Sequence, residues 1–238
     1  MAGYPTQALS LSESAVERAR DLNQPLSMAF ALLYQSWILS WRGELEATSD
    51  SCDQLEVLVE NGGIESFLGL NRVNQGWVAS MRGEHEQGID LIRSGIATWA
   101  PNVFTYHSAI LAEALMRAGR YQEVSEVLSA ARDHALRTGE GHGETEIELI
   151  AGELLMRSDV TNNAEAERHI RRAIAIAVQQ SAKSWELRAT MSLAQLLRDS
   201  GRREEARSIL SEIYNWFTEG FDTRDLKQAK ALLDELAM

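Results

Sequence analysis

The sequence predicts an all-α fold, an αα-superhelix in which helical hairpins stack into a solenoid and a last helix caps it. Two observations predict this class. Apolar segments of helical period alternate with short Arg-Gly or Gly-Arg turns, and glycine readily adopts the left-handed conformation that ends a helix. These glycines also recur at a nearly fixed spacing: Gly43, Gly83 and Gly119 lie 40 and 36 residues apart, and Gly201 follows after 82, or two periods.

The composition suits a folded helical domain. Of 238 residues, 45% are hydrophobic and only 3 are proline, so a continuous core can form and few helices are interrupted. The 35 acidic residues exceed the 23 basic ones and give a net charge of −12, which argues against binding to a nucleic-acid backbone. A single cysteine precludes an internal disulfide, and no signal peptide or membrane-spanning apolar stretch occurs. We therefore expect a cytoplasmic protein without membrane contact.

Three further columns of the repeat support the period. Seven residues before each corner, where the two helices of a hairpin approach closely, the residue is small: Ser36, Gly76, Ala112, Gly152 and Ala194. The columns four residues before and nine residues after the corner read Leu39, Ala79, Leu115, Leu155, Leu197 and Cys52, Ile92, Leu128, Ile170, Leu210. At the fourth corner the turn-rich segment 158–163 replaces glycine and inserts two residues. This pattern is typical of tetratricopeptide repeats, so we expect a tetratricopeptide-like superhelix.

The columns assign every element to one solenoid domain, residues 1–238. A leading half-repeat covers 5–22, and hairpins follow at about 26–61, 64–99, 103–138, 144–180 and 183–217. Their helices are expected at 26–42, 44–61, 64–82, 84–99, 103–118, 121–138, 144–158, 163–180, 183–200 and 202–217. A capping helix with one polar face covers 222–237, and Asp222 is its expected N-cap.

Five segments carry a resemblance to a known family: Gly3–Leu9, Gly76–Ala79, Leu111–Ala114, Gly152–Leu155 and, most specific, Ser184–Leu236. Nearly the whole chain resembles the C-terminal tetratricopeptide region of large bacterial proteins that fuse a nucleotide cyclase domain, an ATPase domain and such repeats. The resemblance implies a sensory or scaffolding role beside a cyclase or ATPase, although this chain has no phosphate-binding loop of its own. It departs from the family at a shortened loop after Trp99 and at Glu148-Leu149, where the family tends to have His-Arg.

No pattern of catalytic or metal-binding residues stands out. The five histidines form no pair at the spacing of a helical zinc site, and the cluster from Glu140 to Glu144 around His142 is expected to be a solvated loop. Cys52 stands in a buried column, where cysteine behaves as a small apolar side chain. No nucleophile turn of the Gly-x-Ser-x-Gly kind occurs. We expect no enzyme activity, no cofactor and no metal site.

The concave groove holds the candidate binding residues. In this fold the first helix of each hairpin lines the groove, at positions thirteen, ten, six, three and two residues before the corner. We select from these positions Phe30, Trp37, Trp41, Trp77, Met81, Tyr106, Met116, Glu153, Arg157, Arg188 and Arg198. The same register contains Glu113 and Glu146. The groove is thus expected to be aromatic and apolar toward the N-terminus and charged toward the C-terminus.

These residues favour a non-catalytic protein-interaction or scaffold module that binds a peptide or partner domain. Tryptophan and methionine would hold apolar side chains, while Arg157 and Arg198 would pair with carboxylates. Two alternatives stay open: the rings fill space between curved helices, or they pack against cyclase or ATPase domains or a second copy of the chain. A rival function is a small-molecule sensor that controls an attached ATPase or cyclase. The uncovered face of the half-repeat at 5–22 is a candidate homodimer surface.

Overall fold

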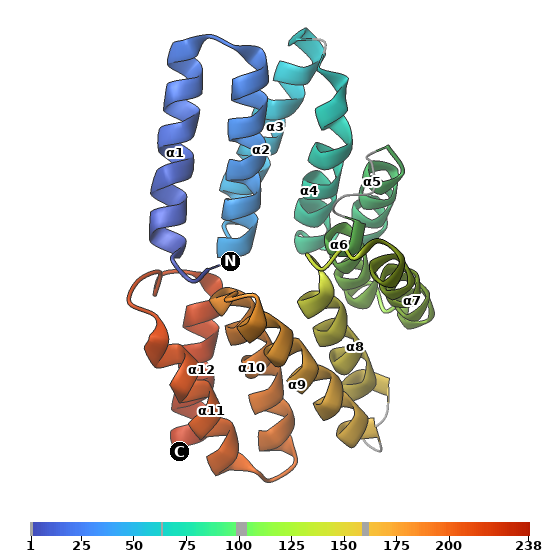
Figure 1. The fold of residues 1–238 in the computed structure, drawn as a ribbon, viewed down its shortest axis with the longest axis vertical. Helices are drawn as coiled ribbons and strands as arrows, with labels where there is room; N and C mark the ends of the chain where they lie inside the picture. Colours follow the sequence, from blue (N-terminus) through green and yellow to red (C-terminus); the bar gives the residue numbers. More distant parts are fainter. Residues whose placement is uncertain (1, 63, 99–103, 159–161) are drawn as a thin grey trace.

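The computed structural model describes residues 2–62, 64–98, 104–158 and 162–238, and these residues form helices joined by short turns (Figure 1). The first half of the array contains α1 (Pro5–Leu22), α2 (Pro25–Arg42), α3 (Leu45–Gly62), the 3-10 turn η1 (Glu65–Phe67), α4 (Leu68–Met81), α5 (His85–Thr98) and α6 (Phe104–Arg117). The second half contains α7 (Tyr121–Thr138), α8 (Glu144–Ser158), α9 (Asn163–Gln179), α10 (Lys183–Asp199), α11 (Arg203–Trp216) and α12 (Arg224–Ala237). The predicted all-α superhelix is confirmed.

The predicted glycine corners end their helices as expected. Gly43, Gly83, Gly119 and Gly201 all have a positive φ, between 73° and 90°, a conformation that side-chain-bearing residues rarely adopt. At each corner the amide after the glycine donates to the carbonyl four residues before it, as Glu44 does to Leu39 at 2.9 Å. This bond satisfies a carbonyl that the helix end would otherwise leave unpaired.

The small-residue column marks close contact between the two helices of a hairpin. A Cβ added at Gly76 on α4 would lie 2.6 Å from the Gly88 carbonyl oxygen and 2.6 Å from Ile92 Cγ1 on α5. A Cβ added at Gly152 on α8 would lie 2.6 Å from Ile170 Cγ1 on α9. The apolar column that faces these small residues is buried throughout: Cys52, Ile92, Leu128, Ile170 and Leu210.

Several predicted boundaries differ from the structure. The segment before α4 is the 3-10 turn η1, so the helix expected from residue 64 begins at Leu68. The expectation that Asp222 caps the last helix is wrong, because α12 begins at Arg224 after Thr223, and the Asp222 carboxylate accepts a hydrogen bond from Arg42 instead. The corner segment at 159–161, the loop after Trp99 and the helix ends expected at 99 and 103 lie outside the described residues.

The curvature of the array brings its two ends together. Figure 1 shows the start of α1 and the end of α2 beside α10 and α12, so that the chain nearly closes into a ring. Three apolar clusters run through it in chain order, centred on α2–α3, on α5–α7 and on α9–α12. A fourth, small cluster joins Ala177, Ala182 and Trp185 to Trp41 and Tyr106 across the ring.

Candidate functional site

Trp41, at the end of α2, is the centre of the contact that closes the ring. Its indole Nε1 donates a hydrogen bond to the Tyr106 hydroxyl at 2.5 Å. Its ring lies edge-on to Trp185 of α10, with centroids 6.3 Å apart, and Trp37 stacks on it at 6.5 Å. Edge-to-face aromatic pairs are favoured over parallel sandwiches, and an indole N–H in such surroundings needs an acceptor. Trp41 therefore holds the N-terminal hairpin against the middle and the end of the array.

Arg188 reinforces this contact from α10. Its Nε donates to Asp225 Oδ2 of α12 at 2.5 Å, its Nη2 donates to the Trp41 carbonyl at 3.0 Å, and its guanidinium lies 4.3 Å above the Trp185 ring. Burial alone would raise the pKa of Asp225, but Arg188 and Arg224 outweigh it and hold that pKa below its usual value. One guanidinium thus joins α2, α10 and α12.

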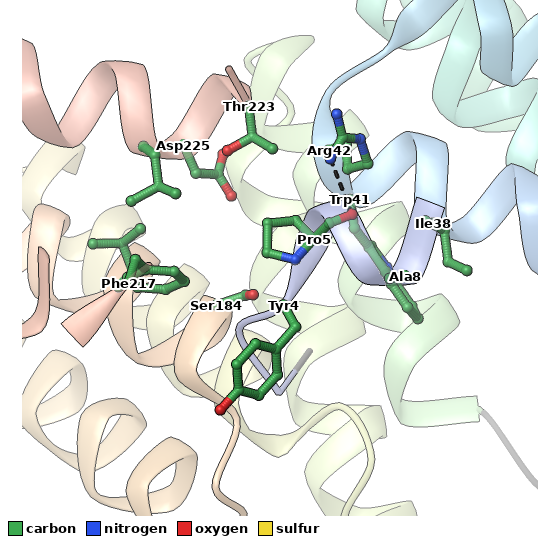
Figure 2. A pocket seen from close by; sticks show the side chains of 12 residues that line it. Tyr4, Pro5, Ala8, Ile38, Trp41, Arg42, Ser184, Phe217, Thr223 and Asp225 are labelled. Atoms are coloured by element: carbon green, nitrogen blue, oxygen red, sulfur yellow. Dashed lines mark hydrogen bonds between the residues drawn. The ribbon is translucent and has the colours of Figure 1, made fainter. Parts of the chain in front are cut away.

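A second junction joins the first residues of the chain and the end of α2 to the C-terminal helices (Figure 2). Arg42, buried at the end of α2, donates to the Pro5 carbonyl at 3.0 Å and to Asp222 Oδ2 at 2.9 Å. Glu219 accepts hydrogen bonds from the backbone amides of Thr6 and Gln7, the exposed amides of the first turn of α1. The space left between these elements is only about 50 Å³, so the two ends of the array are packed together.

An open cavity of about 680 Å³ lies on the concave side of the ring, toward the C-terminal half. Helices α6, α8, α10 and α12 supply its walls, and Met81 enters from the end of α4. Its lining is mixed: methionine, leucine and isoleucine side chains alternate with arginines and carboxylates. The volume is in the range of pockets that bind small molecules or short peptide segments.

Two acidic side chains on this wall, Glu146 and Glu153, differ in their hydrogen bonding. Glu146 of α8 is 5% exposed, and no other described residue donates a hydrogen bond to either of its carboxylate oxygens. Burial raises the pKa of Glu146 to about 8, its own backbone amide and Arg188 oppose the rise, and Glu113 of α6 adds to it. By contrast, Glu153 accepts a hydrogen bond from the Ser192 hydroxyl at 2.7 Å and pairs with Arg157 at 3.7 Å.

The structure separates the predicted groove residues into three groups. Six of them line the large cavity: Met81, Met116, Glu153, Arg157, Arg188 and Arg198. Trp41, Trp77 and Tyr106 line a neighbouring cavity of about 30 Å³, together with Arg188 and Glu146. Trp37 packs edge-on against Tyr34, and Phe30 lies in a separate depression between α1 and α2, where it contacts Phe67. The aromatic part is largely packed, and the charged part remains open.

Sequence reasoning missed two residues of this site, Trp185 and Asp225. Trp185 lies one turn before Arg188, the first groove position of its helix, and it reaches the site because the ring closes. Asp225 belongs to the capping helix, for which the repeat register makes no groove prediction. Glu113 and Glu146 stand in the groove register, and the orphaned state of the Glu146 carboxyl emerges only from the packing around it.

Cys52 and the loop at 140–144, the sequence's candidates for catalysis or metal binding, contribute to packing. Cys52 is buried, and burial raises the pKa of its thiol to about 12, which makes it a poor nucleophile. The loop at 140–144 is not simply solvated as expected: Glu140 accepts hydrogen bonds from the amide and hydroxyl of Thr105, and Gly143 packs against the Thr105 backbone. Within the described ranges, no cluster of His, Cys, Asp and Glu could hold a metal, and no helix has the length and apolarity needed to cross a membrane.

Comparison with known structures agrees with the fold. A chain of the Cut9–Hcn1 hetero-tetramer of the APC/C superposes on 99% of this chain with a TM-score of 0.60 and 12% sequence identity. Yeast Tom70 matches over 98%, with a TM-score of 0.48 and 11% identity. This chain spans 46% and 59% of their respective lengths. No protein-family model and no curated protein matches the sequence. The chain is therefore a tetratricopeptide-like αα-superhelix, and the likeness extends to fold alone.

Proposed function

We propose that this chain is a non-catalytic interaction scaffold that binds a peptide or a partner domain in the concave cavity. Residues 1–238 would form one continuous solenoid domain of a cytoplasmic bacterial signalling protein. The family resemblance suggests cyclase or ATPase domains of the same polypeptide as one source of the partner, and a separate protein as the other.

The cavity of about 680 Å³ is the observation that carries this proposal. It is concave and lies where the first helices of successive hairpins converge, and its apolar side chains include Met81, Met116 and Met191. Methionine is flexible and polarisable, so such a surface adapts to different apolar side chains. The aromatic residues nearer the N-terminus support the cavity by closing the ring.

Selection from a random-peptide display library tests the proposal. Gln195 is exposed and lines the cavity, so Gln195→Trp would place an indole inside it. Ser125 is exposed on α7 outside the cavity, so Ser125→Trp is the matched control. We expect selected peptides to lose at least tenfold in affinity for Gln195→Trp and none for Ser125→Trp. Peptides that bind both variants equally would contradict a binding role for the cavity.

A small-molecule sensor is the second candidate, because the same volume suits a ligand of ordinary metabolite size. Ligand binding would stiffen the contact between the two ends of the array and so affect attached domains. A metabolite that raises the melting temperature of the wild-type chain, and has a smaller effect on Gln195→Trp, would favour this function over peptide binding.

A homodimer is the third interaction that we propose, through the outer face of α1 and α2. A depression of about 510 Å³ runs between these helices, and Leu11, Leu22 and Tyr34 are 71%, 61% and 54% exposed beside it. Contiguous apolar surface of this kind marks an interaction site. Light scattering should show a dimer that Leu11→Glu dissociates, and a monomer at high concentration would count against it.

A further inference from the structure

The strongest unexplained feature of the cavity is the part of its wall that carries two acidic side chains, Glu146 and Glu113. Glu146 lies on α8 and Glu113 on the adjacent helix α6. The charge of Glu113 raises the pKa of the buried Glu146 carboxyl. A buried acid without a hydrogen bond from another residue is costly, because its neighbours and bulk water compensate little of its lost hydration. Side chains that are kept in so unfavourable a state are frequent at functional sites.

The arginines around the cavity donate no hydrogen bond to these two acids in the described part of the chain. Arg188 and Arg224 both donate to Asp225, at 2.5 and 3.1 Å. Arg198 is held by Asp199 and by both oxygens of Glu235. Arg157 and Arg117 are exposed, the first beside Glu153. No arginine donates to Glu146 or Glu113 in the described part of the chain, so the interior of the cavity retains unpaired acid.

We propose that the cavity contains a subsite for a cationic side chain, in which Glu146 and Glu113 bind the guanidinium or ammonium group of a basic peptide segment. Met116 and Met81 line the approach and would contact the aliphatic stem. This inference rests on the proposed function and specifies its ligand. The overall charge of −12 would draw a basic segment toward the protein.

The neighbouring cavity of about 30 Å³ explains how the site exists without its ligand. It borders Glu146 and Glu113, and it has room for about two water molecules. The cation would replace such water and supply the donors that the carboxylates lack. A charge-assisted hydrogen bond of this kind is roughly twice as strong as a neutral one.

Proton linkage gives the subsite a measurable signature. The groups facing Glu146 are Glu113 and Tyr106 from α6, Arg188 from α10, and Arg224 and Asp225 from α12. With a pKa raised to about 8, the free Glu146 carboxyl is largely protonated at neutral pH. A bound cation favours the carboxylate, so binding releases a proton. Affinity should therefore rise with pH, by up to about tenfold per unit below pH 8, and level off above it.

Calorimetry with three capped peptides tests the subsite. The probe alternates arginine with leucine; one matched peptide has citrulline for arginine, which keeps the shape without the charge, and the other has glutamate. Arginine stays charged throughout the pH range used, so any pH dependence belongs to the protein. We expect the arginine peptide to bind at least tenfold more tightly than the citrulline peptide, and the glutamate peptide not to bind.

Isosteric variants locate the effect. Glu146→Gln and Glu113→Gln keep the side-chain shape, and Glu146→Gln removes a buried ionisable group, so both should fold. Each is expected to lose at least tenfold in affinity for the arginine peptide, and Glu146→Gln should abolish proton release. Glu153→Gln is the matched control, because Ser192 and Arg157 already engage that carboxyl; its affinity should change less than about threefold.

The outcomes separate the subsite from the scaffold function. Equal binding of arginine and citrulline peptides, preferred binding of the glutamate peptide, or no loss in Glu146→Gln would overturn the cationic subsite. If none of the three peptides binds, while display-selected peptides without basic residues still depend on the open cavity, the subsite fails and the scaffold function stands. If no selected peptide is sensitive to Gln195→Trp, the scaffold function itself fails.

Discussion

Replacement of Arg188 by methionine tests the closure of the ring most sharply among single substitutions. Methionine keeps an unbranched stem and removes the guanidinium that joins α10 to α12 and α2. The Arg188 and Asp225 side chains are only 17% and 11% exposed, and the bond between them is 2.5 Å long. Removing one partner of a buried pair costs about 3–5 kcal/mol, because the other charge remains uncompensated. Arg224 still lies 3.1 Å from Asp225, so we expect the lower end, about 3 kcal/mol.

Urea denaturation followed by circular dichroism would measure this loss, in a double-mutant cycle with Asp225→Asn. If the two side chains act as a pair, the double variant should be more stable than the sum of the single losses predicts, by about 2 kcal/mol. A loss below about 1 kcal/mol for Arg188→Met, or strictly additive effects, would refute the reasoning. A loss this small would show that the ring does not depend on this guanidinium, and additive effects would show that Arg188 and Asp225 do not act as a pair.

Three further predictions follow from single sites. Gly76→Ala should destabilise the fold by about 1–3 kcal/mol in urea denaturation, because the added Cβ meets the backbone of α5, although alanine favours helix. Gly141→Ala is the control: a Cβ has room there, so stability should change by less than about 0.5 kcal/mol. Cys52 should react with a thiol reagent at pH 8 only as fast as the protein unfolds, because burial raises its pKa to about 12; immediate reaction would contradict its burial. The depressed pKa of Asp225 contributes stability that is present above pH ~4 and lost as pH falls through the folded value, so Arg188→Met should flatten the acid limb of the stability–pH curve.

Local rules explain why the repeat could be predicted. A glycine corner, a small residue and an apolar residue recur within each hairpin, and each constrains neighbours a few residues away. Gly76 was placed at a close helix contact by its column, and the structure puts a backbone carbonyl 2.6 Å from its missing Cβ. The groove register likewise selects Arg157 and Arg198, and both side chains line the concave cavity.

The closure of the ring could not be predicted from these rules. The bond between Arg188 and the Trp41 carbonyl joins residues 147 positions apart. Small rotations between successive hairpins add up over the whole array, and no local column encodes their sum. The same limit applies to Asp222, which satisfies the N-cap preference but instead accepts a hydrogen bond from Arg42, 180 positions away.

Methyl NMR of the methionines measures most directly whether the concave cavity is the recognition site. Met81, Met116 and Met191 line the cavity, while Met28 packs against the N-terminal core and is not part of the cavity lining. Titration with a cavity-dependent peptide from the display selection should shift the three cavity methyl signals and leave Met28 unchanged. A shift confined to Met28, or none at the three cavity methionines under saturating peptide, would contradict the central claim that the closed superhelix binds its partner in this cavity.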